Sequence, residues 1–216
     1  MINCIDLDNF ALTGNVSRYN EDSLTAQQLL IKSARHTKDA VELLKSLDEG
    51  IKNMFSMLEL SYNSGLEELV LSENTHIMYN GARRIARYYF LFNENSKSLI
   101  ELAGDINKVI NDGLTAIPNI ISQLSNVEGV EIEDKLEELQ AQLDNCYLDI
   151  YDDCSFTTLE LAGSTAKNVN EFITLVNMLE TIAITINSSS LTFSYTEDGE
   201  MLITSVANND DEILEI

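Results

Sequence analysis

Helix-breaking residues are scarce in this sequence. The chain of 216 residues contains a single proline, Pro118, and only nine glycines. Proline removes a helix hydrogen bond and glycine costs conformational entropy, so both residues break helices. With so few of them, long stretches of the chain are free to form uninterrupted helices.

Basic residues are also scarce, because 13 Lys and Arg stand against 36 Asp and Glu, for a formal net charge of −23. Phosphate backbones and anionic membrane surfaces are bound through clustered Lys and Arg. Direct nucleic-acid binding is therefore not expected. The deficit lies mainly in the second half, since residues 1–108 hold 11 basic and 15 acidic side chains, whereas residues 109–216 hold 2 and 21. This half is predicted to attract basic surfaces.

The cysteine count and the apolar runs exclude further classes of protein. Cys4, Cys146 and Cys154 form an odd set without a metal-binding spacing, which favours a reducing compartment over a disulfide scaffold. No apolar run reaches the roughly 18 residues that cross a bilayer, so no membrane insertion is expected. The first residues lack a basic and an apolar signal region, which predicts a cytoplasmic protein or export without a Sec-type signal.

Helical periodicity is what the chain does contain. Apolar residues at spacings of three, four and seven predict four long helices, over residues 23–62, 75–111, 131–152 and 155–187. Shorter helices are expected at 66–72 and at 118–127, where Pro118 fits a first turn after the sequence Asn-Asp-Gly ends the second long helix. Short connections between amphipathic helices imply antiparallel neighbours. The predicted fold is mainly α, an antiparallel bundle of about four long helices with coiled-coil seams.

Both ends of the chain differ from this bundle domain, which is assigned to residues 23–187. Residues 1–22 are predicted to be an extended or partly disordered segment, because loose alternation gives way to turn-forming residues. Residues 188–216 contain two alternating apolar runs around Glu-Asp-Gly-Glu, followed by an acidic tail. Asp-Gly between such runs predicts a small β-hairpin.

Catalytic motifs are missing from the sequence. It contains no phosphate-binding glycine loop, no dinucleotide-binding motif and no nucleophile elbow. His36 and His76 have no second ligand at a metal-binding spacing, and the carboxylates at 144–153 fall outside the apolar seam of their helix. We therefore expect a protein that is not an enzyme and has no cofactor or metal. An enzyme built from dispersed residues is the less favoured alternative.

The acidic second half carries the functional hypothesis. The carboxylates expected to bind a partner are Glu131, Glu133, Asp134, Glu137, Glu138, Asp144, Asp149, Asp152 and Asp153. They predict a non-enzymatic interaction module that binds a basic partner protein, as an adaptor, a chaperone-like protein or a delivered phage or bacterial effector. The alternative is a nucleic-acid mimic that inhibits a DNA- or RNA-binding enzyme, because helix carboxylates at i and i+4 lie about 6 Å apart, near the phosphate spacing. Simple solubility is the plain interpretation of the charge.

Arginine is concentrated in one stretch, NGARRIARYYFLFNENSK at residues 80–97. Arg83, Arg84, Arg87 and Phe90 combine residue types that are enriched at the centres of protein interfaces. We predict that they either dock the acidic half within one chain or join two chains in a homo-oligomer.

Overall fold

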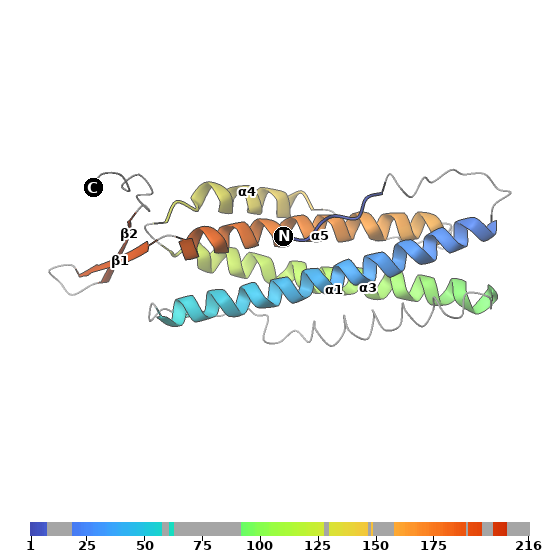
Figure 1. Ribbon diagram of the computed structural model, residues 1–216, viewed down its shortest axis with the longest axis horizontal. Helices are drawn as coiled ribbons and strands as arrows, with labels where there is room; N and C mark the ends of the chain where they lie inside the picture. The colour runs from blue at the N-terminus through green and yellow to red at the C-terminus, as the bar shows by residue number, and fades with distance from the viewer. Residues whose placement is uncertain are drawn as a thin grey trace, which may run out of the picture.

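A computed structural model describes residues 1–7, 19–57, 61–62, 92–127, 130–146, 148, 158–188, 190–195 and 201–206. Most of these residues belong to helices α1 (Tyr19–Met57), α3 (Phe92–Leu124), α4 (Glu133–Asp144) and α5 (Thr158–Ser188). The helices pack lengthwise against one another (Figure 1). The prediction of a mainly helical chain with packed helices is confirmed.

The direction of α1 relative to α3 and α5 differs from the predicted antiparallel order, whereas α4 runs against both α3 and α5, as that order requires (Figure 1). The colour gradient in Figure 1 shows that α1, α3 and α5 run the same way. The contacts between α3 and α5 also show that these two helices are parallel. Asn107 is hydrogen-bonded to Asn168, and further along both helices Gly113 lies against Phe172. Only α4, among the described helices, runs against α5. The prediction assumed short connections, whereas residues 58–91 separate α1 from α3 and are long enough to return the chain to the same end.

Helix α5 is the centre of the bundle, since α1, α3 and α4 all pack against it. Its predicted seam is buried from Ala162 through Phe172 to Ile186. Among the described residues, Thr158–Ile186 is the one stretch whose length and mean hydropathy, 1.4, would suit a membrane span. The core helix of a soluble protein passes the same test, and the absence of membrane insertion stays a prediction.

Helix α3 continues where the sequence predicted a break. The prediction ended a helix at the Asn-Asp-Gly before Leu114 and began a short one at Pro118, but both positions lie inside α3. Tertiary packing explains the difference, because the buried apolar series runs on from Ile110 through Ile117 to Leu124. Gly113 faces the ring of Phe172, so it allows close packing and does not end the helix.

The remaining boundaries also shift. Helix α1 ends at Met57, and beyond it Tyr62 packs on Phe55, with ring centroids 5.1 Å apart, and donates a hydrogen bond to Asp48 Oδ1 at 2.9 Å. The predicted helix over 131–152 is shorter, because α4 ends at Asp144 with Asn145 as its C-cap. The predicted short helix at 66–72 lies outside the described residues.

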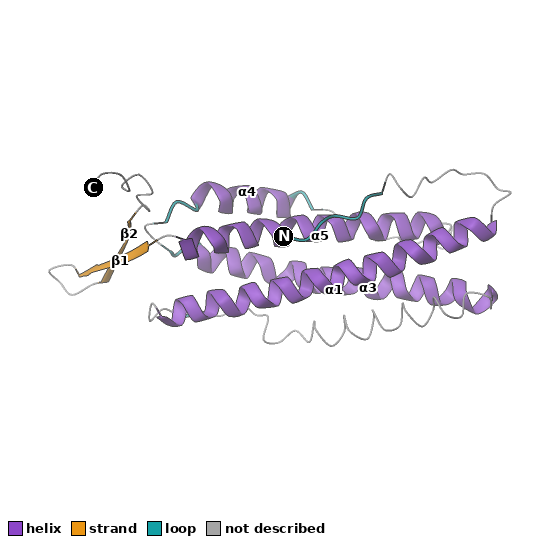
Figure 2. Ribbon diagram, viewed as in Figure 1, coloured by secondary structure: helices purple, strands orange, loops and turns teal. Residues whose placement is uncertain are grey.

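Two short strands follow α5 (Figure 2). Strand β1 (Ser190–Tyr195) pairs antiparallel with β2 (Met201–Val206), with Ser190 opposite Val206 and Tyr195 opposite Met201. The Glu-Asp-Gly-Glu turn that would join them lies outside the described residues, so the complete hairpin stays a prediction.

Candidate functional site

Helix α4 is fixed to α5 along one side. Leu136 and Leu139 are buried there, and two polar contacts flank them. Lys135 Nζ donates a hydrogen bond to Thr185 Oγ1 at 2.7 Å, and Gln142 Nε2 donates one to Glu171 Oε2 at 3.2 Å. Because these contacts lie at both ends of the apolar pair, they set the rotation of α4 and decide which of its residues face outward.

The outer side of α4 is acidic. The exposed carboxylates in and just before the helix are Glu131, Glu133, Asp134, Glu137, Glu138 and Asp144. Glu133 and Asp134 lie in the first turn, where the helix dipole favours negative charge. Positions four apart share a face, so Glu133 lies above Glu137 and Asp134 above Glu138. We call these six carboxylates the α4 acidic face.

The structure thus describes only part of the predicted sites. Six of the nine predicted partner-binding carboxylates belong to the α4 acidic face, whereas Asp149, Asp152 and Asp153 lie outside the described residues. The predicted interface residues Arg83, Arg84, Arg87 and Phe90 also lie outside them. Their docking within one chain or between two chains stays a prediction.

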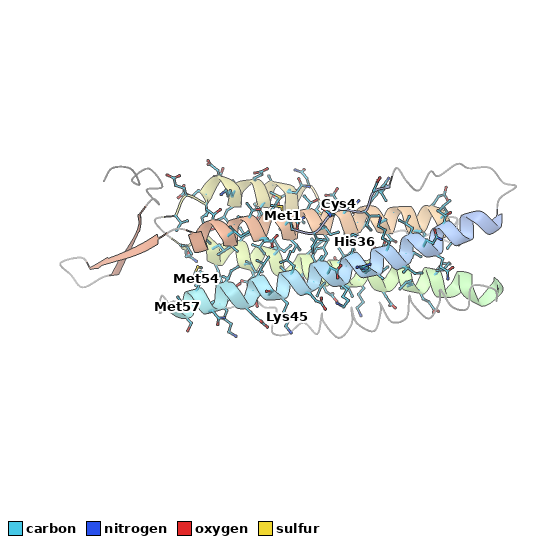
Figure 3. The ribbon with its side chains drawn as sticks, in the orientation of Figure 1. Met1, Cys4, His36, Lys45, Met54 and Met57 are labelled. Atoms are coloured by element: carbon cyan, nitrogen blue, oxygen red, sulfur yellow. The ribbon has the colours of Figure 1, made fainter. Side chains whose placement is uncertain are left out.

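A second feature, which the sequence did not predict, is an ordered contact between the chain start and α5. Ile2 N–H donates to Asn177 Oδ1 at 2.8 Å, and Asn177 Nδ2 donates back to the Ile2 carbonyl at 2.8 Å. Asn170 forms the same pair with Ile5, at 2.7 and 2.9 Å. We call residues 1–7 the N-terminal segment, which Figure 3 shows lying along α5. Each asparagine amide therefore binds the backbone of one residue through both of its hydrogen-bonding groups.

The spacing of these two pairs has a geometric basis. Asn170 and Asn177 are two helical turns apart, or about 10.5 Å along α5. Three residues of an extended chain span up to roughly 10 Å, which is close to this distance. Ile2 and Ile5 therefore both lie opposite an asparagine of α5, and both pairs form at once.

Apolar burial and charge complete the contact. Ile5 is only 2% exposed, and Ile2 and Leu7 pack against the core. The ammonium group of Met1 lies 2.7 Å from Glu180 Oε2. The N-terminal segment therefore runs antiparallel to α5, from Glu180 to Asn170. We call this stretch of α5 the docking site.

His36 of α1 borders the docking site and forms a hydrogen bond with the backbone of Asn3. Its Nδ1 atom is buried and has no hydrogen-bond partner. Burial lowers the pKa of His36 from its ordinary value, and nearby Lys32 adds to the shift, while Asp39 opposes it. Neutral imidazole is therefore the favoured form at this position.

Acidification is expected to weaken the fold through His36. Because its folded pKa is lowered, the unfolded chain binds this proton more readily. The stability that the neutral His36 contributes is fully present above its ordinary pKa of 6.5. This stability is lost as the pH falls through the lowered pKa of the folded state. Urea unfolding followed by circular dichroism at pH 7.5, 6.5 and 5.5 should show a smaller decline in His36→Gln than in the wild type. Equal slopes would contradict this assignment.

The remaining chemical groups of the described residues are the potential metal ligands and the Cys146 thiol. No group of three or more His, Cys, Asp or Glu among them is placed to hold a metal ion. Burial raises the pKa of the Cys146 thiol, and the Glu171 carboxylate raises it further, so its thiolate is disfavoured.

Comparison with protein-family models, curated proteins and solved structures finds no match for this chain.

Proposed function

We propose that this protein is a non-enzymatic interaction module whose α4 acidic face binds a basic surface of a partner protein. The observation that carries the proposal is the exposure of six carboxylates around one helix whose opposite side is fixed by Leu136 and Leu139. The helix contains one basic residue, Lys135, and its ammonium group is hydrogen-bonded to Thr185 of α5. The α4 acidic face thus presents negative charge on a helix whose other side is packed against α5.

Electrostatics define the partner that suits this surface. A net charge of −23 repels acidic partners and accelerates encounters with basic ones, especially at low ionic strength. Exposed ion pairs contribute about 0.2–1 kcal/mol each, so four pairs together contribute about 1–4 kcal/mol, which changes an affinity by about fourfold to several hundredfold. Such contacts weaken in salt because exposed charges are screened beyond about 10 Å at 0.1 M.

Neutralising the α4 acidic face is expected to lower partner affinity by about tenfold at 0.1 M salt. The test variant combines Glu133→Gln, Asp134→Asn, Glu137→Gln and Glu138→Gln, which keep side-chain size. A matched control combines Glu49→Gln, Glu101→Gln, Asp105→Asn and Glu160→Gln, which are exposed residues of other helices. Both variants lose four negative charges from the same total of −23.

Binding is measured by biolayer interferometry against a basic protein isolated with the wild-type chain, and against a lysine-rich peptide as a probe. Loss of affinity in the test variant alone supports the proposal. Equal loss in both variants would show that total charge is what matters, and no loss would refute the role of α4. Competition by duplex DNA for the same partner would favour the nucleic-acid mimic instead.

A further inference from the structure

The docking site recognises features that any copy of the N-terminal segment carries. Asn170 and Asn177 each accept one hydrogen bond from a backbone N–H of the segment and donate one to a backbone carbonyl, so these four bonds depend on the backbone of the segment and not on its side chains. The sequence-dependent part is the burial of Ile5, supported by Ile2. None of these contacts requires the segment to belong to the same chain as α5.

The connection to α1 leaves room for the segment to move away. Residues 8–18 link it to Tyr19, and eleven extended residues reach up to roughly 36 Å. From Tyr19 to His36, beside which Asn3 is docked, α1 rises roughly 26 Å. The linker is longer than this path, so the segment can leave the docking site without unwinding α1.

Charge also permits this segment to approach another copy. Two chains of −23 repel each other over most of their surfaces. The N-terminal segment carries one acidic side chain, Asp6, and the Met1 ammonium group that meets Glu180. It is therefore a nearly neutral part of a strongly acidic chain, and it brings a cation to a carboxylate.

We propose that residues 1–7 of one chain occupy the docking site of a second copy, so that two chains exchange N-terminal segments and form a dimer. The contacts in the closed monomer and in the exchanged dimer are the same. The balance between them is set by the concentration of chains relative to the effective concentration that the linker imposes. The surface is independent of the α4 acidic face.

Two full-length variants with complementary defects test this exchange. Ile5→Asp places a carboxylate at a buried apolar position, which releases the segment and leaves an intact, empty docking site. Asn170→Asp with Asn177→Asp keeps the side-chain shape but removes the donors that face the Ile2 and Ile5 carbonyls. That variant retains an intact segment that has lost its own site.

At several hundred micromolar, a 1:1 mixture of the two variants should contain at least tenfold more dimer than either variant alone, by light scattering against the 24.2 kDa monomer mass. Adding wild type in place of either variant should reduce the dimer, because its own segment competes. A mixture that stays monomeric, with both variants as helical as wild type by circular dichroism, would overturn the proposal.

Two further results keep the test decisive. If either variant loses helicity, the milder pair Ile5→Ala and Asn170→Ala with Asn177→Ala replaces it, and the same outcomes apply. A synthetic peptide of residues 1–7, labelled at the exposed Cys4, is also added to the Ile5→Asp chain. Peptide binding without dimer formation would overturn a second copy as the occupant. It would assign the docking site to free extended peptides instead.

Discussion

Asn168→Asp is expected to lower the free energy of unfolding at pH 7 by about 3 kcal/mol or more. Asn168 is 2% exposed, and its Nδ2 atom donates to Asn107 Oδ1 at 2.9 Å. Asn107 Nδ2 in turn donates to Thr165 Oγ1 at 3.4 Å, which ties α3 to α5 at this level. An aspartate cannot donate to Asn107, and it buries a charge with no cation among these partners.

The pH dependence separates this cause from a general loss of packing. A buried carboxylate has a raised pKa, so as the pH falls it binds its proton at a higher pH in the folded state than in the unfolded state. Its destabilisation should therefore shrink as the pH falls from 7 to 5. Urea unfolding curves at both pH values measure this change.

Asn119→Asp is the matched control for Asn168→Asp. Asn119 is exposed on α3, and its Oδ1 atom accepts a hydrogen bond from Gln123 Nε2 at 3.5 Å, which an aspartate can still accept. Its effect should stay within about 0.5 kcal/mol at either pH. Equal effects of the two substitutions would show that the Asn107–Asn168 pair is not buried in solution.

The apolar residues of α5 could be recognised as core from the sequence, whereas its buried polar residues could not. The apolar seam of α5 was predictable because Val169, Phe172 and Val176 repeat at helical spacing and are all buried. Asn168, Asn170 and Asn177 interrupt the same helix without a pattern that distinguishes a buried amide from an exposed one. A seven-residue spacing of two asparagines was visible, but its partner is a backbone, which leaves no signal in the sequence.

The exposure of the α4 acidic face could be predicted from the sequence, but the direction of α1 could not. The exposure of Glu133, Asp134, Glu137 and Glu138 followed from the burial of Leu136 and Leu139 between them, so periodicity alone sufficed. The direction of α1 relative to α3 and α5 did not follow from periodicity (Figure 1). An apolar seam packs equally well against a parallel or an antiparallel neighbour, and the choice depends on where the connecting segments return the chain.

Gly113 shows how a local signal was outweighed by a distant contact. Glycine after Asn-Asp is typical of a helix end, because it tolerates backbone conformations that other residues avoid. A Cβ atom at Gly113 would instead lie 2.7 Å from Cζ and 2.9 Å from Cε2 of Phe172 on α5. The glycine is therefore explained by the ring that it accommodates, a contact between residues far apart in the chain.

Gly113→Ala is accordingly expected to lower the free energy of unfolding by about 1–3 kcal/mol, the usual cost of overpacking a core. Gly104→Ala, also within α3, is the control: nothing lies within 4 Å of its added Cβ, so it should gain up to about 1 kcal/mol from helix propensity. Opposite signs for one chemical change would identify the Phe172 contact as the cause.

A double-mutant cycle with Phe172→Leu tests that contact directly. The smaller, flexible leucine leaves room for the added methyl group, so Gly113→Ala should cost at least about 1 kcal/mol less in the Phe172→Leu background than in the wild type. Residues that do not touch give additive effects, within about 0.5 kcal/mol. Additive free energies in urea unfolding would therefore mean that α3 and α5 do not approach each other at Gly113. A positive coupling would show that the two parallel helices are in contact there.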